Sequence, residues 1–398
     1  MGRIEDFEKL AFGMFVHFGL YSVIGKGEWY LASYPDSDKE AYSHLPEKFN
    51  VSKNWAKELV KTAKRASCRY ITLTTRHHDG FSLYDTMGLS SFDSIHSKCG
   101  RDLVREFVDE CNENGIVPFF YHTLIDWHEE SYENDFDAYI DYLEKSIFIL
   151  STRYGKIGGF WFDGMWDKPD KDWQEDRIYG IIRKHQPDAI IINNTGLSSR
   201  GKLGHKEIDG VTFERGTPFE LKNAGRKIAG EMCQTMNDHW GYAENDINYK
   251  SVDELVDNLI ECRKYGCNYL LNVGLKKNGN IRPIEKDILS FIGKFIKLNK
   301  DFIYDVFPSD VAAENACVVT DGTYHYVITK NTVMSADPNV TEKICSKKIV
   351  LENAVIESGI WLDSGEEISL TSENSFCEKP FRYGTSPALH RVARLIIK

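Results

Sequence analysis

The chain has 398 residues, enough for a barrel-sized domain with a second domain attached. Hydrophobic residues make up 42% of it and charged residues 27%, which are the proportions of a globular protein. Its net charge of −11 at pH 7 argues against a surface that binds polyanions. We therefore expect no nucleic-acid partner.

The N-terminal segment and the apolar runs bear on where the protein works. Residues Met1 to Asp6 contain no apolar signal region, and no uninterrupted apolar run approaches the length that spans a bilayer. We therefore expect no membrane partner and a cytoplasmic protein, unless a signal segment was trimmed from the sequence.

The cysteines are scattered along the chain, and no Cys-x-x-Cys pair occurs. Their number, nine, is odd. They stand at positions 68, 99, 111, 233, 262, 267, 317, 345 and 377. This pattern favours reduced, mostly buried thiols over a disulfide framework or a zinc site.

Strand-like and helix-like segments alternate through the first 300 residues or so. The expected strands are 12–19, 70–75, 116–123, 157–162, 189–194 and 268–275, with weaker ones at 211–214 and 229–235. The expected helices are 54–66, 102–114, 135–154, 174–185, 252–265 and 285–298. About eight alternations favour a (β/α)₈ barrel, with an open doubly wound sheet as the competing topology.

The pattern changes after Phe307. Short strand-like runs at 324–328, 348–351, 360–362, 367–370 and 393–397 are separated by Gly, Asp, Asn and Ser turns. Such spacing is typical of an antiparallel β-sandwich. We predict a catalytic barrel over 1–306 and a β-sandwich domain over 307–398. The second domain is expected to pack on the barrel, with one wall of the cleft as a further role.

Polar and aromatic residues gather where the expected strands end. They are His17, His77, His78, Tyr121, Trp161, Asp163, Asn193, Asn194 and Glu214. In a parallel barrel, chemistry is built at the C-terminal ends of the strands. Asp163 ends the apolar run 157–162, and the next clear helix starts near Asp172, too far for Asp163 to cap it. This favours a catalytic carboxylate.

Metal and nucleotide chemistry are disfavoured. His77 and His78 are neighbours, and neighbours on a strand point to opposite faces, which makes them poor joint metal ligands. No Gly-rich phosphate loop and no Gly-x-Ser-x-Gly motif occurs. We therefore expect neither a metal nor a cofactor.

A carboxylate pair in an aromatic cleft is the usual equipment for glycoside hydrolysis. Glu28 stands beside Trp29 and Tyr30. Acids accept hydrogen bonds from sugar hydroxyls, while aromatic faces cover the C–H patches of the ring.

These motifs resemble the α-L-fucosidases of glycoside hydrolase family 29. The matching stretches, in the family's order, are Phe12–Ser22, Gly27–Tyr30, Tyr70–Phe81, Arg101–Val104, Tyr121–Trp127, Trp161–Gly164, Asp238–Tyr242 and Asn268–Gly274. The His-His-Asp-Gly-Phe block at 77–81 and the Trp-Phe-Asp-Gly block at 161–164 are together quite specific.

The resemblance implies retaining hydrolysis of terminal α-L-fucosides on a barrel followed by a β-sandwich, with fucosylated oligosaccharides or glycoconjugates as substrates. Asp163 matches the family's nucleophile. For the acid/base, Glu214 is the first choice and Glu231 the second. The residues that match those holding the fucose ring are His17, Glu28, Trp29, His77, His78, Tyr121 and Trp161.

Three departures from the family pattern leave alternatives open. Phe18 replaces a family tryptophan, Thr195 replaces an arginine that contacts the sugar, and Gly230 replaces the tryptophan of a Trp-Glu pair. Arg215 is a candidate substitute for the lost arginine. The alternative is a catalytically weak or inactive fucose-binding relative, and a third reading is another glycosidase activity. The sequence leaves the oligomeric state open, a homo-oligomer included.

Overall fold

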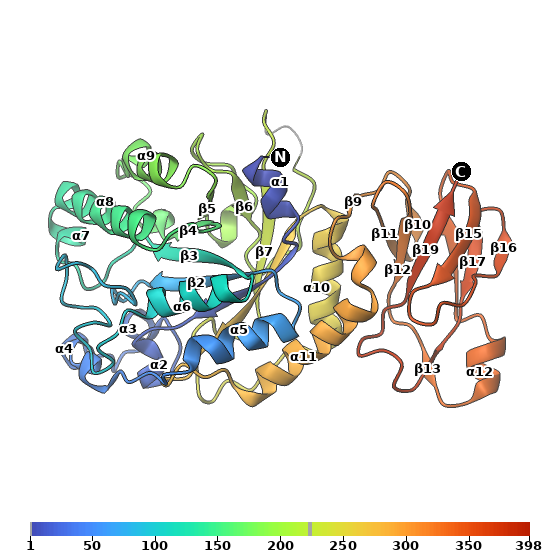
Figure 1. The fold of residues 1–398 in the computed structure, drawn as a ribbon, viewed down its shortest axis with the longest axis horizontal. Helices are drawn as coiled ribbons and strands as arrows, with labels where there is room; N and C mark the ends of the chain where they lie inside the picture. Colours follow the sequence, from blue (N-terminus) through green and yellow to red (C-terminus); the bar gives the residue numbers. More distant parts are fainter. Residues whose placement is uncertain (1, 222–224) are drawn as a thin grey trace.

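The computed structural model describes residues 2–221 and 225–398, and its first part is a closed barrel of parallel strands (Figure 1). In barrel order the strands are β1 (Phe12–His17), β2 (Tyr70–Arg76), β3 (Val117–Thr123), β4 (Gly159–Asp163), β5 (Ile190–Asn194), β6 (Gly210–Thr212), β7 (Ala229–Thr235) and β8 (Asn268–Gly274). Parallel pairing of β1 with β8 closes the ring. The barrel prediction is therefore confirmed, and the open sheet is excluded.

Helices surround the barrel on the outside (Figure 1). The long ones are α5 (Trp55–Arg65), α6 (Leu103–Glu113), α8 (Phe136–Arg153), α9 (Glu175–His185), α10 (Val252–Lys264) and α11 (Pro283–Leu298). The short ones are α1 (Arg3–Glu8), α2 (Tyr21–Ile24), α3 (Tyr30–Ser33), α4 (Lys39–Ser43), α7 (Ser131–Asn134), η1 (Leu45–Lys48), η2 (Met165–Asp167), η3 (Leu197–Ser199) and η4 (Lys300–Phe302). Within the described ranges, none of the helices has the length and apolarity needed to cross a bilayer.

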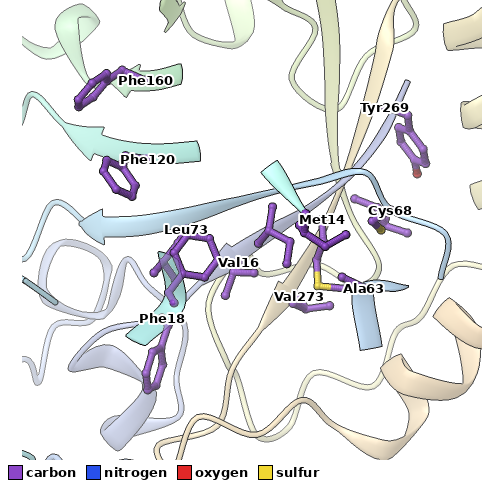
Figure 2. Close-up of a cluster of buried hydrophobic side chains, with 14 of the residues drawn as sticks. Met14, Val16, Phe18, Ala63, Cys68, Leu73, Phe120, Phe160, Tyr269 and Val273 are labelled. Carbon is purple, nitrogen blue, oxygen red and sulfur yellow. The ribbon is translucent and has the colours of Figure 1, made fainter. Parts of the chain in front are cut away.

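Alternation along each strand separates two apolar layers. On β4, Phe160 and Phe162 belong to the layer between strands and helices, whereas Trp161 belongs to the barrel interior. Figure 2 shows Phe160 of β4 and Phe120 of β3 in the outer layer, and Met14 of β1 in another part of the same layer, beside Val273 of β8. Because side chains on a strand alternate, Asp163 shares the inward face of Trp161 and lies at its C-terminal end.

Large side chains fill the interior of the barrel. Besides Trp161 they include Phe15, Tyr70, Phe119, Tyr121, Ile190, Ile192, Cys233 and Leu270. Phe7 of α1 packs at the base of this cluster, with its ring centroid 5.8 Å from that of Tyr70 and 5.7 Å from that of Phe119. The interior is therefore a packed core, as barrel interiors are.

The C-terminal part contains two antiparallel sheets with an apolar core between them. One sheet has the order β15 (Ile356–Trp361), β19 (Val392–Ile397), β12 (His325–Thr329), β11 (Ala316–Thr320) and β9 (Phe307–Pro308). The other has the order β10 (Ala313–Glu314), β14 (Lys347–Leu351), β17 (Ser375–Glu378) and β16 (Leu370–Ser372). A parallel pair, β13 (Met334–Ser335) with β18 (Phe381–Arg382), and α12 (Pro338–Lys343) complete it. The predicted β-sandwich is confirmed.

The expectation that the cysteines are all reduced was wrong for one pair. Cys345, which precedes β14, and Cys377 of β17 form a disulfide. Cys377 lies opposite Lys348 in the antiparallel pair of β14 and β17, and the segment before β14 places Cys345 with its Cα 5.3 Å from that of Cys377. The other seven cysteines are free thiols. Sequence spacing gave no hint of this pair, because strand register is a tertiary property.

The sandwich lies beside α10 and α11, on the flank of the barrel (Figure 1). Lys330 and His390 of the sandwich form ion pairs with acidic residues of α10. The domain therefore packs on the barrel, as expected from the sequence.

Candidate active site

A cavity of about 790 Å³ opens at the C-terminal ends of the barrel strands. Of the ten residues predicted for the site, nine line it: His17, Glu28, Trp29, His77, His78, Tyr121, Trp161, Asp163 and Glu214. The remaining lining residues, between Phe15 and Trp240, also belong to the barrel. The sandwich contributes no lining residue from its described part, so the expectation that it forms a wall of the cleft was wrong.

Asp163 receives hydrogen bonds on both carboxylate oxygens. Tyr121 Oη donates to Oδ2 at 3.0 Å, while Trp166 Nε1 and Asn194 Nδ2 each donate to Oδ1 at 3.2 Å. Burial raises the pKa of the Asp163 carboxyl, and the bonds from Trp166, Tyr121 and Asn194 oppose that rise. The donors orient the carboxylate and favour its ionised form.

Glu214 lies two residues beyond the end of β6 and shares a donor with Asp163. Asn194 Nδ2 donates to Glu214 Oε2 at 2.8 Å and to Asp163 Oδ1 at 3.2 Å. Because both oxygens bond the same nitrogen, Asp163 Oδ1 and Glu214 Oε2 are at most about 6 Å apart. Burial raises the pKa of the Glu214 carboxyl, and the negative charge of Asp163 raises it further.

Glu231, the second candidate for the acid, lies inside the barrel and does not line the cavity. Tyr70 Oη donates to its Oε2 at 2.5 Å, and Trp161 Nε1 donates to its Oε1 at 2.9 Å. Burial raises the pKa of Glu231 to about 7. With an oxygen engaged by each donor, this carboxyl orients the Trp161 ring and presents no oxygen to the cavity.

His17 is held as a neutral ring with one nitrogen available. Its Nδ1 lies 2.7 Å from Asn272 Oδ1, and Asn272 Nδ2 donates to Trp240 O at 2.7 Å. That second bond orients the amide, so the Oδ1 atom must accept from His17 Nδ1–H. Burial lowers the pKa of His17 to about 3, which leaves Nε2 unprotonated and able to accept a hydrogen bond from a ligand hydroxyl.

His78 follows the same logic. Its Nδ1 lies 2.6 Å from Thr123 Oγ1, whose own proton goes to Ile125 O, so Nδ1 carries the proton. Burial lowers the pKa of His78 to about 3. Its Nε2 lies 3.6 Å from Asp163 Oδ2, and because the ring is neutral this contact is not an ion pair.

The expectation that His77 and His78 point to opposite faces was wrong. Both line the cavity, with ring centroids 4.2 Å apart. The strand β2 ends at Arg76, so strand alternation no longer applies to them. His77 also stacks on Tyr121 at 5.5 Å. Among the described residues, no group of three or more His, Cys, Asp or Glu side chains has an arrangement suited to a metal ion.

Tryptophans form the outer wall of the cavity. Trp29 contacts His78 edge-on at 5.3 Å and stacks on Trp166 at 6.2 Å. Glu28 also lines the cavity, and its carboxylate accepts a bond from Gly241 N at 2.7 Å. Burial raises the pKa of the Glu28 carboxyl. The cavity therefore offers aromatic faces together with hydrogen-bond acceptors, the combination suited to a sugar.

Sequence comparison assigns the family. The family model described as "Alpha-L-fucosidase" matches residues 3–301. The chain belongs to the α-L-fucosidase family of glycoside hydrolases. It is similar to the tissue α-L-fucosidase of Bos taurus, at 28% identity over 78% of this chain and 71% of the relative. It is also similar to the α-L-fucosidase of Dictyostelium discoideum, at 26% identity over 76% of this chain and 71% of the relative.

Solved structures of fucosidases share this fold over the whole chain. α-L-Fucosidase isoenzyme 1 from Paenibacillus thiaminolyticus superposes with a TM-score of 0.86 at 28% identity, covering 100% of this chain and 99% of its own. A family 29 α-L-fucosidase from Bacteroides thetaiotaomicron, trapped as a covalent intermediate with 2-fluoro-fucosyl fluoride in a Glu-to-Gln mutant, superposes with a TM-score of 0.83 at 21% identity, covering 100% and 96%.

Several lining residues of this fucosidase-family cavity were not among the sequence-predicted set. They include Trp166 and Trp240, whereas Asn194 had been named only as a polar residue at a strand end and Arg215 only as a substitute for the lost arginine. Asn194 ends β5 and Trp240 belongs to the matched segment Asp238–Tyr242, so a position signal existed for both. Trp166 lies on η2, beyond the strand, where neither strand period nor helix period applies.

The structure shows where two of the three positions that differ from the family pattern lie, namely Thr195 and Gly230. Thr195 lines the cavity and donates to Ser199 O, while Arg215 also lines it and stacks on Trp240, its guanidinium carbon 5.0 Å from the ring centroid. Arg215, the candidate substitute for the lost arginine, thus presents a positive charge at the surface of this cavity. Gly230 lies on the outer side of β7: a Cβ there would be 2.4 Å from Cys267 Sγ. The missing tryptophan therefore does not widen this cavity.

Proposed function

We propose that this protein is a retaining exo-α-L-fucosidase, which removes terminal α-L-fucosyl residues from glycans by double displacement. Asp163 is the nucleophile and Glu214 the acid/base. The substrates are fucosylated oligosaccharides or glycoconjugates, as the names of the relatives suggest.

One observation carries the proposal: the bonds from Asn194 keep an oxygen of Asp163 and an oxygen of Glu214 within about 6 Å. Retaining glycosidases have carboxyl groups roughly 5–5.5 Å apart, whereas inverting enzymes need about 6.5–9.5 Å to admit a water. The separation therefore supports direct attack by Asp163, and the trapped intermediate of the Bacteroides relative supports the same mechanism.

In the first step, an Asp163 oxygen attacks the anomeric carbon and the bond to the leaving oxygen breaks. Glu214 donates its proton to that oxygen. Burial raises the pKa of both carboxyls, but their neighbours differ. Three hydrogen-bond donors favour the ionised form of Asp163, whereas the negative charge of Asp163 favours the protonated form of Glu214. The product of this step is a covalent fucosyl-enzyme and a free aglycone.

In the second step, ionised Glu214 takes a proton from water, which attacks the same carbon and releases Asp163. Two inversions give net retention. The fucose ring is bound by acceptors for its hydroxyls, namely Nε2 of His17, Nε2 of His78 and the Glu28 carboxylate. Aromatic rings such as Trp161 contact its apolar side.

The test compares wild type, Asp163→Ala, Glu214→Ala and Glu231→Ala on 4-nitrophenyl α-L-fucoside, with and without azide. Asp163→Ala should lose several orders of magnitude in kcat, because the nucleophile is gone. Glu214→Ala should form the fucosyl-enzyme with this activated leaving group, and azide should restore its turnover and yield fucosyl azide.

Glu231→Ala is the matched carboxylate control, because Glu231 touches Trp161 but not the cavity. It should lose activity without azide rescue. Rescue of Glu231→Ala in place of Glu214→Ala would contradict the assignment of the acid/base. Fucose binding by calorimetry with no turnover of any fucoside by wild type would favour the fucose-binding alternative.

A further inference from the structure

Asn194 has its side-chain amide fixed in one orientation. The residue ends β5 and is 3% exposed. Its Oδ1 accepts from Thr212 Oγ1 at 2.8 Å and from Gly196 N at 3.2 Å. Because a backbone N–H can only donate, the atom facing Gly196 must be the carbonyl oxygen. The NH₂ group therefore faces the two carboxyls of the site.

Both amide hydrogens are used by the catalytic pair. One goes to Asp163 Oδ1 and the other to Glu214 Oε2. An amide NH₂ has two donors and no charge, so it can join two acidic groups without favouring ionisation of both as strongly as a lysine or arginine would.

The two carboxyls differ in their other donors. Asp163 also receives bonds from Tyr121 and Trp166, whereas Asn194 is the one side-chain donor that the structure records for Glu214 among its described residues. With Oε2 accepting from Asn194, the proton of neutral Glu214 belongs on Oε1. That leaves Oε1–H free to be directed at a leaving oxygen.

We propose that Asn194 is a positioning residue of the reaction, which acts through Asp163 and Glu214 by linking them with one amide nitrogen. The link sets the spacing of the two carboxyls and fixes which Glu214 oxygen donates its proton. This inference rests on the proposed fucosidase activity and assigns a role to a residue outside its nucleophile, acid and sugar-binding set.

Other titratable and charged groups also face the pair, so a change at Asn194 must be read against them. From the surrounding strands and loops these are His78, Tyr121, Arg200, Arg215 and Cys233. None of them is bonded to Asn194 in the structure, so substitution of Asn194 leaves their own contacts in place.

The test is the pH dependence of kcat/KM for wild type and Asn194→Ala, because this profile gives the pKa values of the free enzyme's nucleophile and acid. Phenyl α-L-fucoside is the substrate, since its poorer leaving group keeps the acid necessary. Both limbs should move to higher pH, by about one unit, because each carboxylate loses a donor that favours its ionised form. kcat/KM at the optimum should fall by about 10-fold to 100-fold.

Two further variants make the test specific. Asn193→Ala is the matched control: Asn193 precedes Asn194 on β5, points away from the cavity, and bonds Met165 Sδ at 3.5 Å. Both limbs of the pH profile of Asn193→Ala should lie at the same pH as those of wild type. Asn194→Asp conserves the shape if the alanine variant does not fold, and its added charge should raise both limbs further.

Unmoved limbs in Asn194→Ala or Asn194→Asp, whatever the loss of rate, would overturn the positioning role while leaving the fucosidase activity intact. Absence of turnover by wild type, on phenyl and on 4-nitrophenyl α-L-fucoside, would instead overturn the proposed function, and this inference with it.

Discussion

Trp166 contacts both the proposed nucleophile, Asp163, and the solvent. Its Nε1 donates to Asp163 Oδ1 at 3.2 Å, while 39% of the side chain is exposed at the mouth of the cavity. Trp166→Phe removes the donor but keeps an aromatic ring. Hydrogen bonds to charged groups contribute about 1.5–3 kcal/mol, so we expect kcat/KM for an aryl α-L-fucoside to fall by roughly 10-fold to 100-fold.

The control for that variant is Trp127→Phe. Trp127 also contacts Trp29, with centroids 5.3 Å apart, but does not line the cavity. Its substitution should change kcat/KM much less, measured with the same substrate. Equal losses in Trp166→Phe and Trp127→Phe would mean that packing around Trp29, and not the bond to Asp163, determines the rate.

The sequence predicted the position of a site residue correctly where that residue lies within a regular strand. His17, Tyr121, Trp161 and Asp163 lie on strands, where a two-residue period assigns them to the inward face. Beyond a strand end that rule fails, and the pair His77 and His78 shows it. Glu214 follows β6 and lines the cavity, whereas Glu231 is the third residue of β7 and lies deep in the barrel, a depth consistent with its place near the start of the predicted strand 229–235.

At the level of elements, the packing around β4 explains why glycines precede Asp163, the proposed nucleophile. A Cβ on Gly159 would be 2.5 Å from Ile190 O and 2.8 Å from the Phe119 ring. Gly159→Ala must displace backbone or a buried ring, and such overpacking costs about 1–3 kcal/mol. We expect the free energy of unfolding, measured with urea, to fall by that amount.

Gly180→Ala is the matched control, because Gly180 lies on α9 with nothing within 4 Å of an added Cβ. There the same substitution should stabilise the protein by up to about 1 kcal/mol, the difference in helix propensity. A Gly159→Ala protein as stable as wild type would show that β4 and β5 can separate without cost.

Helices and strands with a regular hydrophobic period were predicted with small errors at their ends. The short strands were harder to predict, because local sequence carries no information on strand pairing. β6 spans only Gly210–Thr212, so its existence depends on pairing with β5 and β7. β9, β10, β13 and β18 have two residues each. Strands this short have no period of their own, and the approach of Cys345 to Cys377 on β17 is a property of the folded domain.

At the scale of the whole molecule, an ionic row joins the two domains. Asp253, Asp257 and Glu261 follow one another at four-residue spacing on α10 and so share a face. Lys330 lies 2.9 Å from both Asp257 Oδ1 and Glu261 Oε1. His390 has its Nε2 2.9 Å from Asp257 Oδ1 and its Nδ1 3.2 Å from Asp253 Oδ1.

The protonation of His390 should make this interface depend on pH. Burial lowers its pKa, but hydrogen bonds and charge from Asp253 and Asp257 outweigh burial, so the pKa lies above the usual 6.5. A raised pKa stabilises the fold fully below pH 6.5, and that stabilisation is lost as pH rises through the folded value. The lowered pKa values of both aspartates act oppositely, and their contribution is lost only as pH falls below the usual 3.8.

The row is therefore complete between about pH 4 and 6.5, and we expect stability to decline from pH 6.5 to 8.5 by about 1.4 kcal/mol for each unit that the His390 pKa is raised. Urea unfolding across this range measures it. His390→Gln keeps a hydrogen-bonding side chain but cannot titrate, so its stability should be lower at pH 6 and should change less between pH 6.5 and 8.5. A decline of equal size in wild type and His390→Gln would assign the pH dependence to groups other than His390 and would contradict its titration at this interface.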